Sequence, residues 1–240
     1  MIEEVKLLKF QFLMLRLLQF ISTTLLVFAA VSSYAQISNV TAFDGTPVKE
    51  NRYPNVKGSP WLVDAWLEGE IWAEGEQHLK NVKLRYDEYA DEVILLKEGK
   101  SFRLNPTTIK GFVIYVPESS DMEAKPYVYK NGYPEVDGNN SSAFYRVLYE
   151  GKKGAFLYRT KVELFENAPT YGSAVNETSF IRKKRYYIYK DGKMHAVRLN
   201  KKDILKTLNS KEAEAFVAKN KMKLKKEEEV IRLFAAIESM

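Results

Sequence analysis

The chain contains no cysteine. This absence excludes a disulfide framework, catalysis by a cysteine nucleophile and attachment of a lipid to a cysteine behind a signal peptide. A protein of 240 residues without cross-links depends on its hydrophobic core for stability. Apolar residues make up 45% of the chain and aromatic residues 13%, a composition that is sufficient for such a core and favours β-structure.

Histidine is nearly as rare, because the chain has only His78 and His195. Neither has a second histidine two or four positions away, so the ligand spacings of metalloproteases and facial-triad iron sites are absent. The sequence also lacks a G-x-S-x-G nucleophile elbow and a G-x-x-x-x-G-K-[ST] phosphate loop, and "GKKG" (151–154) is predicted to be a basic hairpin tip. We therefore predict no catalytic residue, no metal and no cofactor, and we expect that the protein is not an enzyme.

The acidic segment "YDEYADE" (86–92) has the charge, but not the pattern, of a calcium-binding loop. The sixth position of that loop requires glycine and is Glu92 here. We interpret the segment as an acidic turn. A pair of carboxylates elsewhere can still act as acid and base in a glycosidase-like site, so a carboxylate-dependent hydrolase remains one functional hypothesis.

Residues 1–35 are predicted to be a signal peptide for export. An apolar run from Phe20 to Val31 follows the basic Arg16 and leads to the small-x-small cleavage site Ser33-Tyr34-Ala35. Cleavage is expected directly after Ala35. The alternative is an uncleaved membrane anchor.

Basic side chains are concentrated in the last quarter of the chain. Residues 36–180 contain 17 Lys+Arg and 21 Asp+Glu, whereas residues 181–240 contain 17 and 8, so the formal charges of the two parts are −4 and +9. This division predicts an electrostatic role for the C-terminal quarter, or a contact between the two parts.

Pairs that end in glycine recur between strand-like runs and predict a series of β-hairpins, because glycine adopts the positive φ of tight turns. These pairs are Glu74-Gly75, Glu98-Gly99, Asn131-Gly132, Glu150-Gly151 and Asp191-Gly192. Strands are predicted near residues 70–73, 79–86, 93–97, 102–104 and 109–116, with a further strand pair within 143–166. Five short strands in under sixty residues favour a small barrel or a strongly bent sheet.

After residue 199 the period of the apolar residues changes from two to about 3.6, which predicts helices. Asn200 with Asp203, and Asn209 with Glu212, resemble capping arrangements for two short helices. A third helix from about Glu227 places apolar residues on one face, namely Val230, Ile231, Phe234 and Ile237. The predicted fold class is therefore β-rich α+β, with antiparallel hairpins in a small barrel-like sheet followed by C-terminal helices.

The predicted organisation has five parts. They are a signal peptide (1–35), an irregular N-terminal segment (36–60), a small antiparallel β-domain (61–117), a second β-hairpin region (118–199) and a C-terminal helical segment (200–240). The start of translation, at Met1 or at Met14, is left open, as are the number of domains and the oligomeric state.

The basic segment "RKKRYYIYKDGKMHAVRLN" (182–200) is predicted to form the last hairpin. A turn at Asp191-Gly192 places Arg185 opposite Arg198 and Lys190 opposite Lys193, and gives the tyrosines apolar partners in the sheet. Tyrosines engaged in this way are not available to stack on bases, so we expect no nucleic acid as a partner. The like-charged pairs require an anion or an acidic neighbour, and the candidate anion-binding residues are Arg182, Lys183, Lys184, Arg185 and Arg198. The alternative interpretation is a basic sheet edge that discourages edge-to-edge association.

Four segments and the lysine-rich helical end together resemble a type of exported β-rich protein common in Bacteroidota. The segments are "NVKGSPWLVDAW" (55–66), "LRYDEYADEV" (84–93), "FYRVLYEGKKGAFLYR" (144–159) and "YYIYKDGK" (186–193). The resemblance covers most of the chain after residue 35 but brings no activity, cofactor or site residue with it. It implies a Gram-negative cell envelope, with the protein in the periplasm, at the outer-membrane periphery or outside the cell.

The sequence thus leads to three functional hypotheses. The first is a non-enzymatic β-scaffold of the cell envelope that binds a protein or a cell-wall component. The second is a binder of a polyanion, such as an acidic glycan or lipid headgroups, through the basic C-terminal quarter. The third is the hydrolase described above. The membrane is expected as a partner only through the signal peptide before its cleavage.

Overall fold

The computed structural model describes residue 43 and residues 45–240, except for residues 50, 120–121, 123 and 168–176. Residues Asp44–Met240 form one compact unit. The signal-peptide prediction for residues 1–35 lies outside the described residues. Among the helices that are described, none is long and apolar enough to cross a membrane.

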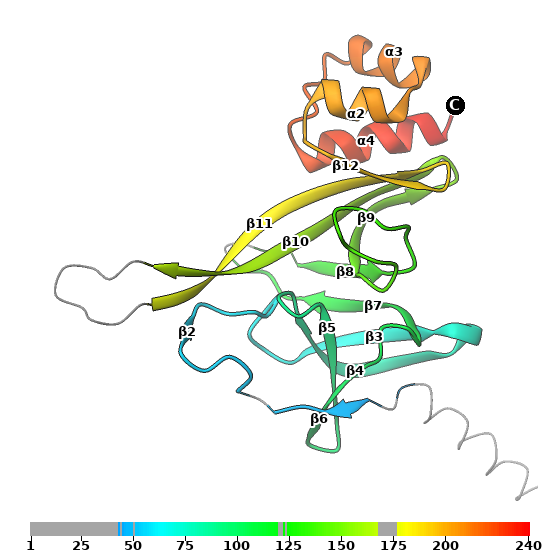
Figure 1. Cartoon of the computed structure of the whole chain (residues 1–240). Coiled ribbons are helices and arrows are strands. Elements are labelled where there is room, and N and C mark those ends of the chain that lie inside the picture. Colours follow the sequence, from blue (N-terminus) through cyan, green and yellow to red (C-terminus); the bar gives the residue numbers. More distant parts are fainter. Residues whose placement is uncertain (1–42, 44, 50, 120–121, 123, 168–176) are drawn as a thin grey trace, which may run out of the picture. The chain divides into compact units, whose positions relative to one another are not determined.

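The described chain is dominated by one large, mainly antiparallel sheet with three helices at its C-terminal end (Figure 1). The strands are β1 (Thr46–Pro47), β2 (Val56–Lys57), β3 (Leu67–Ala73), β4 (His78–Asp87), β5 (Glu92–Lys97), β6 (Lys100–Arg103), β7 (Ile109–Val116), β8 (Lys125–Lys130), β9 (Tyr145–Gly151), β10 (Gly154–Asn167), β11 (Glu177–Lys190) and β12 (Lys193–Val197). The helices are the 3-10 turn η1 (Glu74–Glu76) and the α-helices α2 (Lys201–Leu208), α3 (Lys211–Lys219) and α4 (Glu227–Glu238). The predicted α+β class is confirmed.

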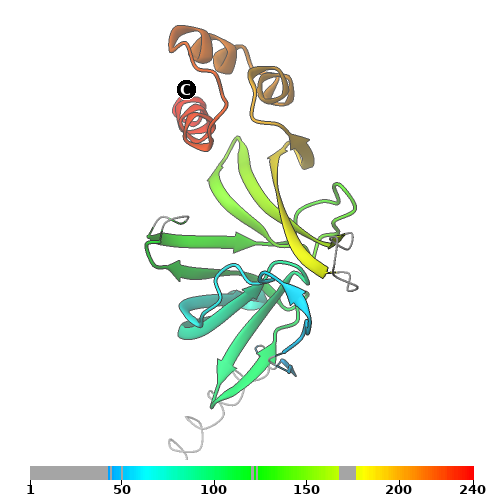
Figure 2. The same cartoon turned by 90° about the vertical axis from the view of Figure 1, so that its left-hand side faces the viewer.

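The strands follow the order β1-β6-β5-β4-β3-β7-β8-β9-β10-β11-β12, and β2 pairs in parallel with β11. Figure 2 shows that the strands turn progressively along this order, and the sheet does not close. The predicted strongly bent sheet is therefore observed, and the small closed barrel is not. The boundary proposed at residue 117 falls between β7 and β8, which are paired neighbours in this sheet.

Two of the glycine-containing pairs form the tight turns that the sequence predicts. Glu98 and Gly99 both have positive φ between β5 and β6, and so do Asp191 and Gly192 between β11 and β12. The turn predicted at Glu150-Gly151 is displaced, because Gly151 still belongs to β9 and the chain reverses at Lys152 and Lys153.

The helices begin close to the predicted positions, with one correction. The side chain of Asn200 accepts a hydrogen bond from the backbone N–H of Asp203 and caps α2, as predicted. The cap of α3 is Ser210, which accepts from the backbone N–H of Ala213, and the prediction of Asn209 is wrong. Asn209 instead ends α2 in the left-handed conformation, with φ of 44°, a role that asparagine shares with glycine.

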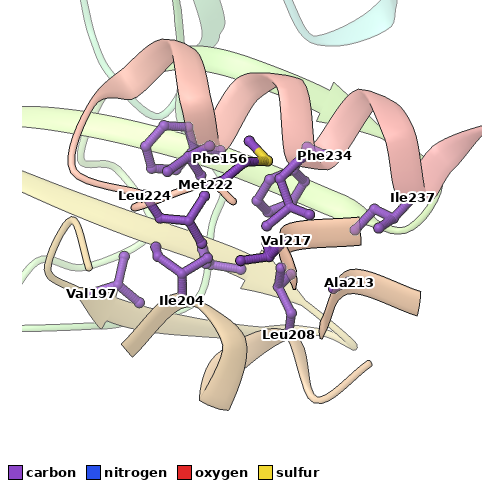
Figure 3. Packing of buried hydrophobic residues seen from close by; sticks show 13 residues of the cluster. Phe156, Val197, Ile204, Leu208, Ala213, Val217, Met222, Leu224, Phe234 and Ile237 are labelled. Carbon is purple, nitrogen blue, oxygen red and sulfur yellow. The ribbon is translucent and has the colours of Figure 1, made fainter. Parts of the chain in front are cut away.

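The helices pack on one face of the sheet formed by β10, β11 and β12. Figure 3 shows Phe156 of β10 and Val197 of β12 among apolar side chains from all three helices and from the segment before α4. That cluster includes Ile204, Leu208, Ala213, Val217, Met222, Leu224, Phe234 and Ile237. A second buried cluster lies on the opposite face of the same strands and joins Tyr187 and Met194 to Tyr133 and Tyr145. Residues 155–157 of β10 and 187–188 of β11 are therefore covered on both faces of the sheet.

Candidate functional site

The β11–β12 hairpin has the predicted register over its whole length. Tyr186 pairs with Val197, Tyr187 with Ala196, Ile188 with His195, Tyr189 with Met194 and Lys190 with Lys193. The ladder ends at the Tyr186–Val197 pair, so the predicted pairing of Arg185 with Arg198 is not formed. The chain leaves the sheet there because the backbone N–H of Arg198 donates to the carboxylate of Asp203, at 3.3 Å between N and Oδ2, in the first turn of α2.

The other edge of β11 pairs with β10, which places the four candidate residues 182–185 opposite residues 159–162. Side chains alternate between the two faces of a strand. Lys183 and Arg185 therefore lie on the face of Tyr187, whereas Arg182 and Lys184 lie on the face of Ile188 and the helices. The basic run is thus divided between two surfaces and does not form a single patch.

Arg182 is engaged within the protein. Its Nε donates to Glu88 Oε2 at 3.1 Å, and its Nη2 donates to the carbonyl oxygen of Trp61 at 2.6 Å. Glu88 is only 6% exposed, so this guanidinium provides the counter-charge of a buried carboxylate. Lys184 on the same face has its Nζ 6.0 Å from the centre of the Tyr158 ring, at the outer limit of a cation–π contact.

Lys183 shares a carboxylate with Lys161. The Nζ atoms of the two lysines lie 2.6 and 2.8 Å from the oxygens of Glu163. These two contacts lower the pKa of Glu163 to about 2, so that its carboxylate is charged throughout the physiological pH range. Two cations and one anion leave this group with a net positive charge.

Arg185 lies directly opposite Arg159 in the β10–β11 ladder. Arg159 is mostly buried and held in place, because its Nη1 donates to Asp91 Oδ2 and to the carbonyl oxygen of Phe144, both at 2.9 Å. Arg185 is exposed and forms no ion pair among the described residues. Arg185 therefore lies opposite a like charge that the sequence did not predict, Arg159, and not opposite Arg198.

A cavity of about 320 Å³ opens beside this pair. It is lined by Asp137, Asn139, Arg159, Lys161, Arg185 and Tyr187. Three of these side chains are cationic, one is a carboxylate and two are neutral hydrogen-bonding groups. A cavity of this composition and size matches an anionic group, such as a carboxylate or sulfate with part of the molecule that carries it.

The rim of the cavity opposite the strands is a tight turn. Asp137 and Gly138 both have positive φ, and Val136 and Asn139 exchange two backbone hydrogen bonds across them, at 3.1 and 2.9 Å. The hydroxyl of Tyr187 donates to Asp137 Oδ2 at 3.3 Å. Burial, followed by the charge of Asp137, raises the pKa of Tyr187, so this hydroxyl stays protonated and remains a donor.

The five predicted site residues thus lie in different places. Arg185 lines the cavity, Lys183 shares Glu163 with the cavity residue Lys161, and Arg182 and Lys184 point to the other face. Arg198 lies outside the lining. The sequence did not identify Asp137, Asn139, Arg159, Lys161 and Tyr187 as site residues. Their identification requires the β10–β11 pairing, which places Arg159 opposite Arg185 and was not predicted from the sequence.

Within the acidic segment, residues 88–91 form the turn between β4 and β5, and the carboxylates of the segment are engaged within the protein. Asp91 accepts from the Tyr86 hydroxyl at 2.6 Å and from Arg159, and Glu92 pairs with Arg103 at 2.9 Å. Within the described residues, no three His, Asp or Glu side chains are placed to hold a metal ion together. His78 is also engaged, with its Nε2 2.7 Å from Glu70 Oε2.

Comparison of the chain with known proteins finds no matching family model, no similar curated protein and no similar solved structure. Function is therefore inferred from the geometry of the chain itself.

Proposed function

We propose that the protein is an exported, non-enzymatic binding protein of the cell envelope, and that it binds an anionic group of a glycan in the cavity beside Arg185. The observation that carries the proposal is the Arg185–Arg159 pair at the edge of a cavity that also contains Lys161. Acidic glycans provide carboxylate or sulfate groups of the right charge on a sugar that fits a polar cavity.

The two guanidinium groups have complementary roles. Arg159 is fixed by Asp91 and Phe144, so little conformational entropy is lost when a ligand approaches it. Arg185 is exposed and forms no ion pair within the described part of the chain, so its guanidinium is available for bidentate contact with a carboxylate or sulfate. Like charges opposite each other in a sheet are unfavourable, and an anion between them relieves that repulsion.

Nucleic acid is a poorer match because the aromatic rings of the hairpin are occupied. Tyr187 is buried against Tyr145, with ring centroids 5.2 Å apart, and Tyr186 lies against Phe156 and Tyr158. Single-stranded nucleic acids are bound by exposed rings above a basic groove. The cavity instead combines charge with hydrogen-bonding groups, which supports a glycan ligand.

The first test is retention of the purified chain on a heparin column. Arg185→Glu is expected to weaken the interaction by about tenfold or more. It removes a hydrogen-bond donor, and it introduces a negative charge beside Arg159 that repels the anionic ligand. The wild-type chain should elute at the higher salt concentration, since contacts between exposed charges are screened by salt.

The matched control is Arg198→Glu, which makes the same change in net charge at an exposed arginine outside the cavity. Its retention should stay close to that of the wild-type chain. If Arg198→Glu and Arg185→Glu reduce retention equally, binding follows the total charge of the C-terminal quarter and the proposed site is wrong.

Neutralising the one carboxylate of the cavity is expected to have the opposite effect. Asp137→Asn keeps an oxygen that accepts from Tyr187 but removes the negative charge that repels an anion. We expect binding of an acidic oligosaccharide to become about three- to tenfold tighter, measured by isothermal titration calorimetry. Unchanged or weaker binding would place the anion outside this cavity.

A further inference from the structure

The hairpin of β10 and β11 is longer than its neighbours. Strand β9 pairs with β10 only at residues 154–158, so residues 159–167 of β10 have β11 on one side and, among the described residues, no strand on the other. Figure 1 shows this part of the hairpin extending past the ends of β8 and β9. An unpaired strand edge presents free backbone N–H and C=O groups and is a template for another strand.

Large apolar side chains on this part of the hairpin are exposed. Leu164 is 43% and Phe165 is 52% exposed, and Ile181 of β11 is 37% exposed. Leu164 and Phe165 lie on the unpaired strand itself, on its two different faces. Such side chains beside an open edge indicate a surface that is covered in an assembly.

The charges along the open edge of β10 indicate that its pairing partner is a second copy of the same strand. Lys161 and Glu163 flank Val162, so an antiparallel pairing of β10 with a second copy of itself, centred on Val162, places each Lys161 opposite Glu163 of the other copy. The same register places Thr160 opposite Leu164. Moving the centre by one residue in either direction puts two lysines or two glutamates face to face on the axis, which is unfavourable.

We propose that two copies of this chain associate through the open edge of β10, residues Thr160–Leu164, as an antiparallel strand pair about a twofold axis at Val162. The contact is isologous, so the same residues serve both copies and the assembly closes at two. The two hairpins together form a continuous four-stranded ribbon, β11-β10-β10-β11.

The edge of β11 does not offer the same match. It contains four consecutive cations, Arg182 to Arg185, and an antiparallel self-pairing centred on that run places cation opposite cation. The interpretation of the basic run as an edge that discourages association thus fits β11. The open part of strand β10 has its cations, Arg159 and Lys161, before its anions, Glu163 and Glu166, so an antiparallel second copy presents the opposite order of charges and this edge is self-complementary.

The association is tested with two charge-reversed variants, Lys161→Glu and Glu163→Lys. The first places glutamate opposite glutamate twice in the dimer, and the second places lysine opposite lysine twice. Each variant alone is expected to raise the dimer dissociation constant by about tenfold or more. An equimolar mixture of the two restores both opposite-charge contacts and should associate as a heterodimer.

Sedimentation velocity over a range of concentrations measures the dissociation constants, and native mass spectrometry of a mixture in which one variant is labelled with ¹⁵N identifies the heterodimer by its mass. Lys193→Glu, an exposed lysine on β12, is the matched control and should associate like the wild-type chain. Circular dichroism of each variant verifies the fold, since exposed ion pairs contribute little to stability. A wild-type chain that stays monomeric at all concentrations, or a mixture that associates no better than its components, would overturn the proposal.

This inference does not rest on the anion-binding function, although Lys161 takes part in both, because it lines the cavity and lies on the open edge of β10. It is measured by mass in the absence of any glycan, and Arg185→Glu, the variant that tests the cavity, leaves the edge of β10 unchanged.

Discussion

Truncation of Phe234 to alanine is expected to destabilise the protein by about 3–5 kcal/mol, the usual loss for a large aromatic side chain in a well-packed core. Phe234 is 1% exposed and is the aromatic side chain through which α4 contacts the sheet. Its ring lies 5.6 Å from Tyr149 of β9 and 6.1 Å from Phe156 of β10, measured between centroids. Without it, α4 loses its main contact with both strands and leaves a cavity between helix and sheet.

The measurement is the free energy of unfolding from urea denaturation. Arg232→Ala, on the exposed face of the same helix, removes a side chain of comparable length and is expected to cost about 0.5 kcal/mol or less. Its Nη2 donates to Asn220 Oδ1 at 2.9 Å, and its guanidinium carbon lies 6.0 Å from the centre of the Phe216 ring, at the outer limit of a cation–π contact. Equal losses from the two substitutions would contradict the placement of α4 on the sheet.

The second large effect is expected at Asp87, whose side chain is fully buried. Its Oδ1 accepts from the backbone N–H groups of Tyr89 and Ala90, at 3.1 and 2.9 Å. Its Oδ2 accepts from the Tyr53 hydroxyl at 2.8 Å and from Arg52 Nη1 at 3.0 Å. Asp87→Ala removes all four contacts at a fully buried position and takes this acceptor away from partly buried donors, so we expect the free energy of unfolding to fall by about 3 kcal/mol.

Asp87→Asn tests the charge of Asp87 separately from its hydrogen bonds to the turn, because the amide oxygen can still accept from the two backbone N–H groups. The free energy of unfolding should fall less in Asp87→Asn than in Asp87→Ala. The control at an exposed ion pair is Asp64→Ala, which removes the partner of Arg85 at a position with a 69% exposed side chain. We expect a change of about 1 kcal/mol or less there, and thermal or urea unfolding of the three variants ranks them.

Much of the fold was predictable because its signals are local. Asp191-Gly192 specifies a turn by its own backbone preference, and that turn alone sets the register of β11 and β12. The change of apolar period after residue 199 likewise depends on neighbours along the chain, and it correctly predicts the helices. The cap of α3 was misplaced by one residue because Asn209 and Ser210 both favour helix ends, and only packing decides which of them ends α2.

The candidate site was less predictable because it depends on pairing between distant residues. The β10–β11 ladder joins residues 154–167 to 177–190, and no tight-turn signal next to these strands specifies its register. The partner predicted for Arg185 from the sequence is therefore wrong, and Asp137 was not identified because it reaches the same cavity from the loop between β8 and β9. By contrast, the division of residues 182–185 between the two faces of the sheet could be predicted from the strand alone, because side chains alternate along any β-strand.

The most direct test of the anion-binding function is an NMR titration of the ¹⁵N-labelled chain with oligogalacturonate. We predict chemical-shift changes concentrated at Asp137, Asn139, Arg159, Lys161, Arg185 and Tyr187, their absence in Arg185→Glu, and no response to a neutral galactose oligosaccharide. Changes centred on Arg198 and the helices instead, or changes that persist unaltered in Arg185→Glu, would contradict the proposed site. A wild-type chain that shows no change at saturating ligand would contradict the function itself.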